Sequence, residues 1–277
     1  MLKRILLLLG DSAASASARA YAFQLAQETG AGLAGLAGID LAALAVTSLG
    51  RAGAGGLKVR LERDLRAQAE DQQHRLRAGY QQACADHGVP FEWLAFEGAP
   101  LAALQQASET RDLLVTGCDT GFQGGVEVPL PDLLARLLAL TPRPCVVCGE
   151  EPPHGGDVLV AYDGSVPAMR SVQMFALIGL ATGRKVRVIS VDPSQEEAAR
   201  RASAAVSYLE SHGYQAEAMP ITSRISPPDV LRLETANVKA SLLVMGSYGH
   251  RGLKELLFGS TTHKLVENPP AALFVYH

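Results

Sequence analysis

The stretch SLLVMGSYGHRGLKELLFGSTTHKLVENPPAALFVY, residues 241–276, decides the fold of this chain and its candidate site. Apolar runs at residues 242–245 and 273–276 are typical of buried strands. Between them lie a glycine-rich basic turn and then Gly259-Ser260-Thr261, which is typical of a helix start. This order brings backbone N–H groups, hydroxyls and a helix dipole to one point, which favours phosphate binding. A surface turn without a ligand is the alternative, but it would gain nothing from Ser260 and Thr261.

The chain contains two copies of one plan. KRILLLLGDSAASASARAYAFQLAQETGAGLAGLAGID, residues 3–40, and DVLVAYDGSVPAMRSVQMFALIGLATGRKVRVISVD, residues 157–192, each give a strand, an Asp turn, a small-residue helix, a glycine and a strand. Asp11 of the first copy corresponds to Asp163 of the second. Gly30 and Gly183 are expected to end the two helices, since glycine is the usual residue there.

Apolar strands and helices alternate along both copies. We therefore expect an α/β protein of two tandem doubly wound domains, each a five-stranded parallel sheet with helices on both faces. The domains are expected at residues 1–149 and 157–277, with a linker near residues 150–156. Paired prolines before the last strand of each half fit strand entry or an edge strand. The expected strands are 4–9, 33–39, 91–96, 113–116 and 145–148, then 157–162, 186–191, 215–220, 242–245 and 273–276.

The two halves differ after their second strand. The first half carries a glycine-rich segment at residues 41–57, expected as a surface loop rather than a lid, and then a long polar helix at residues 60–87. The corresponding helix of the second half is shorter, at residues 195–212. Ser226 followed by two prolines predicts a further helix cap with proline in the first turn.

Length and composition exclude several classes of protein. The chain has 277 residues, a net charge of −3 and only 19% charged residues, so it lacks the basic field that nucleic acid attracts. No apolar run approaches the ~18 residues that cross a bilayer. The N-terminal stretch mimics a signal peptide, but its apolar run, residues 5–9, is shorter than the usual ~7–15 residues and recurs inside the chain. We expect a first strand there and a cytoplasmic protein.

Cysteine usage points to a reducing compartment rather than to a metal site. Cys145-x-x-Cys148 has the spacing of a redox pair or half a zinc site. It falls within an apolar strand, however, where side chains three residues apart point to opposite faces. Buried structural thiols are therefore expected.

Other motifs fail on context. Gly30-x-Gly32-x-x-Gly35 fits the dinucleotide pattern but follows a helix and precedes a strand, the reverse of what pyrophosphate binding requires. Gly10-Asp11-Ser12 resembles the nucleophile block of GDS-type esterases, but no base and orienting acid can be assembled around it. The seven histidines show no metal spacing. His250 and His263 flank the glycine-rich turn and are expected as solvated residues, with phosphate contact by His250 as the alternative.

One family matches the glycine pattern. Gly246-x-x-Gly249, nine further residues and Gly259-Ser260 resemble the nucleotide-binding motif of the universal stress protein family. The resemblance implies an adenine nucleotide alpha hydrolase-like fold and a site that assigns a role to each matched position. Asp163 would bind ribose, or ribose and the adenine edge. The turn Ala161-Tyr162-Asp163 and the strand end Ser190-Val191 would line adenine. Met245 and Gly246 would lie near the ribose and α-phosphate, and the phosphates would be held by Gly249, Gly259, Ser260 and Thr261.

The first half departs from this pattern. Gly117 matches Gly246, but CDTGFQGGVEVPLPD replaces the loop, and Leu130-Pro131 stand near the positions of Gly259-Ser260. Proline has no N–H to donate, and Glu127 and Asp132 add repelling charge. We therefore predict one competent site, in the second half. The family usually dimerises through its last strands, which this chain can pair internally as a pseudo-dimer; a homodimer is a further possibility.

The function that the resemblance implies is binding of ATP, AMP or ADP, with Mg²⁺, by a regulator of stress survival. Slow ATP hydrolysis is compatible with it, since no dedicated water-activating base stands beside the loop; no catalytic or metal-ligating residues are assigned. A dimeric interaction module with a vestigial glycine loop is the alternative. An adenylate-handling enzyme of the related alpha hydrolase group is a third reading.

Overall fold

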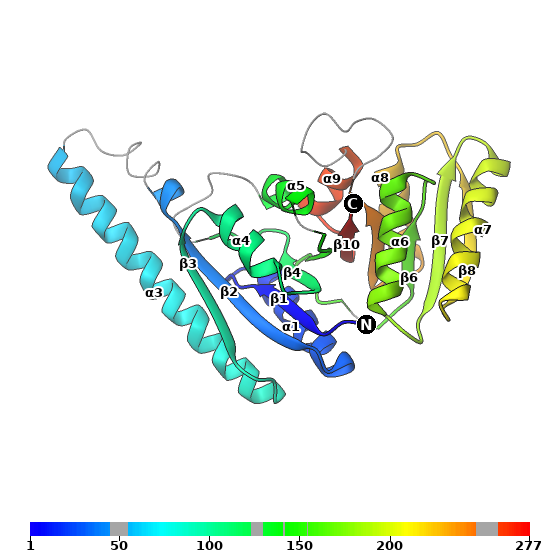
Figure 1. Cartoon of the computed structure of the whole chain (residues 1–277). Coiled ribbons are helices and arrows are strands. Elements are labelled where there is room, and N and C mark those ends of the chain that lie inside the picture. Colours follow the sequence, from blue (N-terminus) through cyan, green and yellow to red (C-terminus); the bar gives the residue numbers. More distant parts are fainter. Residues whose placement is uncertain (45–54, 123–129, 141, 154, 248–259) are drawn as a thin grey trace.

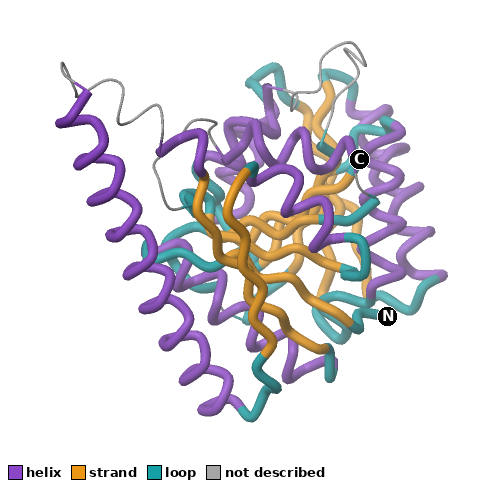
Figure 2. The backbone as a smooth tube through the Cα atoms, turned by 60° about the vertical axis from the view of Figure 1, so that its left-hand side comes forward, coloured by secondary structure: helices purple, strands orange, loops and turns teal. Residues whose placement is uncertain are grey.

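The computed structural model describes residues 1–44, 55–122, 130–140, 142–153, 155–247 and 260–277, and of residues 55–59 the backbone alone. In these residues ten strands form one sheet with helices on both faces (Figures 1 and 2). The strands are β1 (Arg4–Leu8), β2 (Gly32–Asp40), β3 (Glu92–Gly98), β4 (Leu113–Gly117), β5 (Cys145–Cys148), β6 (Val158–Ala161), β7 (Lys185–Asp192), β8 (Gln215–Thr222), β9 (Leu242–Gly246) and β10 (Ala272–Tyr276). The helices are α1 (Ala13–Thr29), α3 (Gly55–His87), α4 (Pro100–Ser108), α5 (Leu130–Leu140), α6 (Val166–Ile178), α7 (Gln195–Ser211), α8 (Pro227–Asn237) and α9 (Ser260–Glu267).

The strand order is β3-β2-β1-β4-β5-β10-β9-β6-β7-β8. Within each half the neighbouring strands pair in parallel, and the order of the second half mirrors that of the first. The expected doubly wound α/β fold is confirmed, and each half contributes five strands. In Figure 1 the halves lie side by side, the first on the left.

The halves join through their last strands. β5 and β10 pair antiparallel, with Leu273 opposite Val147, Phe274 opposite Val146 and Val275 opposite Cys145. This is the internal pairing expected of a pseudo-dimer, and it turns two sheet edges into the centre of one sheet. The prolines before these strands therefore mark strand entry rather than an edge.

Side chains of each strand alternate between two cores. Ile5 and Leu7 belong to the core under α1, α3, α6 and α7, whereas Leu6 and Leu8 belong to the core under α4, α5, α8 and α9. Both faces are covered, which explains why the strands are continuous apolar runs. Cys145 and Cys148 are buried and lie in opposite cores, as the strand alternation predicts.

Equivalent caps open and close the first helix of each half. Ser12 and Ser165 are N-caps whose side chains accept hydrogen bonds from Ser15 and Ala168 N–H groups. Gly30, in the left-handed region at φ 66°, ends α1 as expected. The expectation for Gly183 is wrong: α6 ends four residues earlier, at Gly179, which takes φ 78° and donates its N–H to Phe175 O.

The crossover helices agree with the sequence. α3 runs to His87 as a long, largely exposed helix at one end of the molecule (Figures 1 and 2), and α7 is shorter. The choice between loop and lid concerns residues 41–57, of which residues 45–54 lie outside the described part of the chain. Ser226 is the N-cap of α8, with Pro227 at its first position; its hydroxyl bonds to Asp229 rather than to a backbone N–H.

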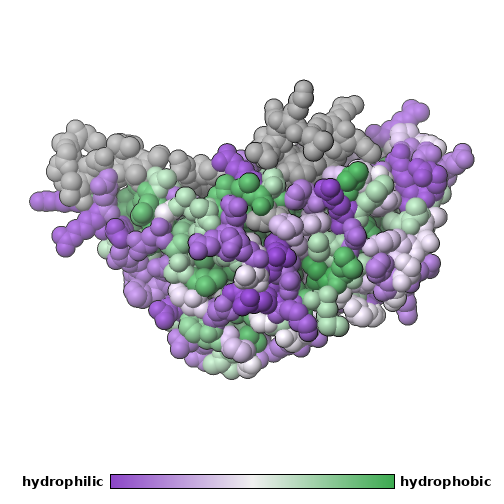
Figure 3. Space-filling model, in the orientation of Figure 1, coloured by the Kyte–Doolittle hydropathy of each residue, from purple (hydrophilic) through white to green (hydrophobic). Residues whose placement is uncertain are grey.

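Figure 3 shows small hydrophobic patches distributed among hydrophilic side chains on one face of the molecule. Exposed apolar side chains include Val166, Met169 and Leu177 on α6. Among the described residues, none of the helices combines the length and hydropathy needed to cross a membrane.

Gly117 and Gly246 end β4 and β9 against the first turn of a helix. A Cβ on Gly117 would lie 2.5 Å from Ala14 C and Ser15 N, and one on Gly246 would lie 2.7 Å from Ala168 N. Backbone atoms cannot yield as a flexible side chain can. Glycine therefore stands at the equivalent position of both halves because a Cβ there would clash with the backbone of the neighbouring helix.

Gly117→Ala is expected to destabilise the protein by about 1–3 kcal/mol, because the added methyl group forces β4 away from α1. Gly121→Ala is the control, since a Cβ at this exposed position meets nothing within 4 Å. Urea denaturation measures both variants. Equal stability of the two would contradict the packing role.

Burial raises the pKa of the Cys145 and Cys148 thiols well above the ordinary range and that of half-buried Cys118 less far. Because a raised pKa lowers the thiolate fraction, a thiol reagent at about pH 8 should label Cys118 first. All four cysteines should react in denaturant, which serves as the control. The same shift stabilises the fold at neutral pH, and this contribution is lost as pH rises above about 8.5, where the unfolded thiols ionise.

Candidate functional site

The carboxyl ends of β6, β7 and β9 bring most of the expected site residues to one edge of the second half. Open α/β sheets bind ligands at this edge. Ala161 ends β6 with Asp163 just beyond it, Ser190 and Val191 lie near the end of β7, Met245 and Gly246 end β9, and Ser260 and Thr261 begin α9. Gly249 and Gly259 lie outside the described residues, so their expected phosphate contacts remain predictions.

The β6–α6 turn holds Asp163 at the sheet edge. Its Oδ1 accepts the Ser165 N–H at 2.9 Å, and Gly164 takes φ 78°, a left-handed conformation that suits glycine. Tyr162 N–H donates to Ile189 O at 2.9 Å, which ties the turn to β7. Burial, together with the Asp163 carboxylate, raises the pKa of the Tyr162 hydroxyl. The turn thus presents a carboxylate in a fixed place.

Ser190 and Val191, the two expected site residues of β7, lie on opposite faces of the sheet. Ala161, Val191 and Met245 pack with the core under α8 and α9, and together they form an apolar wall at the strand ends. Ser190 has the parity of Val188, which belongs to the opposite core. Val191 and Ser190 therefore face different sides of the sheet, a distinction that a dipeptide motif does not make.

Two buried hydroxyls at this edge have no hydrogen-bond partner among the described residues. Ser190 is 1% exposed and Ser247 is 0% exposed, and neither Oγ makes a hydrogen bond there. Buried polar groups are normally paired, so each such hydroxyl offers a donor and an acceptor to a polar ligand or a water. Sequence reasoning missed Ser247, although its place directly after the Gly246 turn was a usable signal.

α9 is tied to the end of β9. Thr262 Oγ1 donates to Gly246 O at 3.2 Å, so the first turn of the helix is held against the strand. Ser260 is the first residue of α9, and its N–H is among those that a helix leaves unpaired. Thr262 was not among the expected site residues, because its contact joins positions sixteen apart through a tertiary hydrogen bond.

A charged pair borders the other side of the turn. Arg201 of α7 donates to Asp192 Oδ2 at 2.9 Å, and its aliphatic stem lies 3.6 Å from where a Gly164 Cβ would stand. Arg201 therefore lies beside Gly164 in the β6–α6 turn. No sequence motif marks it, since it follows from how α7 packs.

In the first half, the equivalent turn is occupied by the chain's own side chains. Asp119, just after β4, accepts a hydrogen bond from Ser12 Oγ at 2.6 Å. Thr120 Oγ1 lies 2.8 Å from Ser15 Oγ and accepts the Gly117 N–H. Asp11 accepts from Gln72 of α3. A carboxylate thus stands at the N-terminus of α1, where a phosphate would meet repulsion.

α5 begins at Leu130, as α9 begins at Ser260, which supports the sequence equivalence of these positions. Asp132 was expected to repel phosphate in its own half. Its Oδ1 instead lies 3.7 Å from His263 Nε2 of α9, across the junction between the halves. Glu127 lies outside the described residues.

The arrangement in the second half fits an adenine nucleotide. An apolar wall suits a base, the Asp163 carboxylate suits a ribose diol, and the helix start suits phosphate. No group of three His, Cys, Asp or Glu side chains suited to a metal occurs within the described ranges.

The second half of the chain resembles known proteins in sequence. Residues 156–277 match the sequence profile of the Universal stress protein family. A universal stress protein from Synechocystis sp. is 26% identical over 135 residues, which make up 48% of this chain and 46% of that protein. The chain thus aligns with about half the length of this curated relative.

Solved structures resemble the whole chain. A universal stress protein from Archaeoglobus fulgidus has a TM-score of 0.70 at 18% identity, covering 99% of this chain and 97% of that one. A functionally unknown protein from Pseudomonas aeruginosa has a TM-score of 0.59 at 16% identity, covering 99% and 92%. At these identities the likeness establishes the fold alone, but it does so for both halves.

Two buried serines of the second half provide a matched pair. Ser171 Oγ donates to Met245 O at 2.8 Å, whereas Ser190 Oγ has no partner among the described residues. In nucleotide-free protein, Ser171→Ala should cost about 0.5–1.5 kcal/mol, while Ser190→Ala should cost less or stabilise. Thermal and urea denaturation check this. A larger loss in Ser190→Ala would show that its hydroxyl is already paired.

Proposed function

We propose that the protein binds one adenine nucleotide in its second half, ATP or the related AMP or ADP, with Mg²⁺, because residues 156–277 match the sequence profile of the Universal stress protein family. We propose further that residues 1–149 are a diverged copy of the same domain, and that the protein is a cytoplasmic regulator of the stress response.

The single observation that carries the proposal is the convergence of complementary groups at one sheet edge. Met245, Ala161 and Val191 are apolar, Asp163 supplies a fixed carboxylate, and Ser260 opens a helix beside them. The hydroxyls of Ser190 and Ser247, unpaired among the described residues, add hydrogen-bonding capacity. The expected contacts of Gly249 and Gly259 complete the phosphate end.

The asymmetry of the halves supports a single site per chain. In the first half Ser12, Ser15 and Asp11 already have partners within the chain. A nucleotide would have to break these contacts and approach the Asp119 carboxylate. The first half is therefore proposed to bind no nucleotide and to support the fold, with a homodimer of the whole chain as a further possibility.

The described residues around the site do not favour an efficient ATPase. Asp192 is engaged by Arg201, and Asp163 is held by the turn N–H, so neither is a poised general base. Hydrolysis, where it occurs, is expected to be slow.

Two other functions stay open: an interaction module that binds no nucleotide, and an enzyme that forms adenylates. Mass spectrometry of ligand released from purified protein tests the interaction module, which would carry no nucleotide. Pyrophosphate release with an added acid or amine tests the adenylate-forming enzyme.

Asp163→Ala is expected to weaken ATP binding by about tenfold or more, since hydrogen bonds to a charged group are worth about 1.5–3 kcal/mol. Ser260→Pro should also weaken it, because it removes a backbone N–H at a helix position that tolerates proline. Calorimetry gives affinity and stoichiometry, and a thermal scan without ATP confirms folding.

Asp11→Ala is the matched control, because it removes the equivalent carboxylate of the first half. Its ATP affinity should equal that of the unmodified protein, with one nucleotide per chain. Equal losses in Asp11→Ala and Asp163→Ala, or two nucleotides per chain, would refute the single-site proposal.

A further inference from the structure

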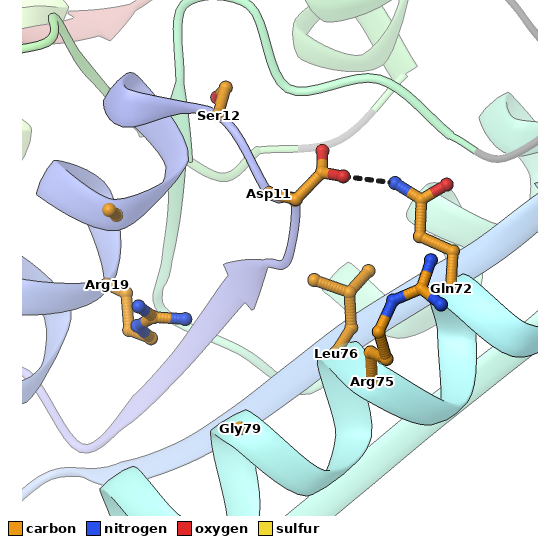
Figure 4. A pocket seen from close by; sticks show the side chains of 9 residues that line it. Asp11, Ser12, Arg19, Gln72, Arg75, Leu76 and Gly79 are labelled. Carbon is orange, nitrogen blue, oxygen red and sulfur yellow. Dashed lines mark hydrogen bonds between the residues drawn. The ribbon is translucent and has the colours of Figure 1, made fainter.

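A pocket in the first half lies away from the nucleotide edge proposed above. It occupies about 260 Å³ between the β1–α1 turn, α1 and α3 (Figure 4). None of its lining residues belongs to the second half. The side chains that matter for its chemistry are Asp11, Arg19, Gln72 and Arg75.

Small residues keep the pocket open. Gly79 lies on α3 in the same helical row as Gln72, Arg75 and Leu76, and a Cβ there would meet nothing within 4 Å. Ala16 lines the opposite wall from α1. A larger side chain at either position would narrow the space, so the cavity follows from the small residues on both helices.

Arg19 supplies a positive charge without a counter-ion. This half-buried side chain extends from α1 toward α3 (Figure 4) and makes no hydrogen bond or ion pair with the described part of the chain. α1 also lacks acidic residues in its first turn. A guanidinium in a pocket is matched best by a carboxylate or phosphate, whose oxygens it can bind in pairs.

Arg75 adds a second guanidinium from α3. Within the described residues its ion pair is with Asp71, and both side chains of that pair are about two-thirds exposed, at 65% and 67%. Exposed ion pairs contribute only ~0–1 kcal/mol, so an anion in the pocket can recruit Arg75 at small cost. Figure 4 draws Arg75 on the Gln72 side of Leu76, so it adds positive charge to the pocket from the end opposite Arg19.

The other end of the pocket is built for hydroxyl groups. Gln72 donates to Asp11, which leaves the second carboxylate oxygen as an acceptor and the amide oxygen of Gln72 as another. Figure 4 shows these two side chains together at one end of the pocket, with Leu76 between them and Arg19. The lining thus changes from hydroxyl acceptors at one end, where Arg75 also lies, to the Arg19 guanidinium at the other.

We propose that this pocket binds a small phosphate monoester that carries hydroxyl groups, with its phosphate on Arg19 and its hydroxyls on Asp11 and Gln72. The volume is slightly below the ~300–1,000 Å³ of pockets for drug-sized ligands, so the pocket suits a small ligand. The site lies in the half without the glycine motif and is independent of nucleotide binding by the other half.

Calorimetry of the full chain with glycerol 3-phosphate tests the site. Arg19→Gln should weaken binding by about tenfold or more, because a charge-assisted contact is lost. Arg77→Gln is the control: Arg77 is exposed on α3 and does not line the pocket, so the affinity of this variant should stay within about twofold. Inorganic phosphate should bind more weakly than the ester, and glycerol should not bind.

Several results would overturn the proposal. Absence of glycerol 3-phosphate binding at concentrations on the order of 1 mM refutes the site. Equal losses of glycerol 3-phosphate affinity in Arg19→Gln and Arg77→Gln would indicate a general effect of net charge and would refute the pocket. Competition by ATP, or loss of ATP affinity in Arg19→Gln, assigns the pocket to the nucleotide instead. Unchanged ATP binding alongside lost glycerol 3-phosphate binding supports two separate sites.

Discussion

The antiparallel pairing of β5 with β10 is the constraint on which the rest of the structure depends. Each half ends in a short apolar strand that would otherwise expose unpaired backbone groups at a sheet edge. Joining Val146 to Phe274 at the centre satisfies both edges and makes one sheet of the described strands. It also turns the two halves through a pseudo-twofold axis, so that equivalent helices cover the same face of the sheet.

Within this symmetric frame, the two halves differ most clearly in the residues that come directly after β4 and β9. Gly117 and Gly246 have the same packing role, so the strand ends and helix starts are placed alike in both halves. The chain then diverges. After Gly117, Asp119 and Thr120 turn back onto the hydroxyls of α1. After Gly246, Ser247 has a hydroxyl that is unpaired among the described residues. One half therefore satisfies its own polar groups, and the other keeps groups that a ligand can satisfy.

The sequence predicted the fold well because its signals are local. Strands that are buried on both faces are continuous apolar runs in the sequence. Because the chain contains two copies of one plan, each strand could be located in both copies. Local signals failed where tertiary contacts decide. Gly179 and Gly183 are both glycines in left-handed conformations, and nothing local indicates which one ends α6. The bonds of Thr262 to Gly246, Gln72 to Asp11 and Arg201 to Asp192 join separate elements, so no motif reveals them.

The diverged half also helps to build the site of the other. α5 packs against α9, and Asp132 lies within 3.7 Å of His263, three residues after the helix start at Ser260. α9 is held on its other side by Thr262 on Gly246. The helix that opens the phosphate end is thus fixed between its own strand and the neighbouring half. This constraint does not require a nucleotide in the first half, which gives a physical reason for keeping both halves in one chain.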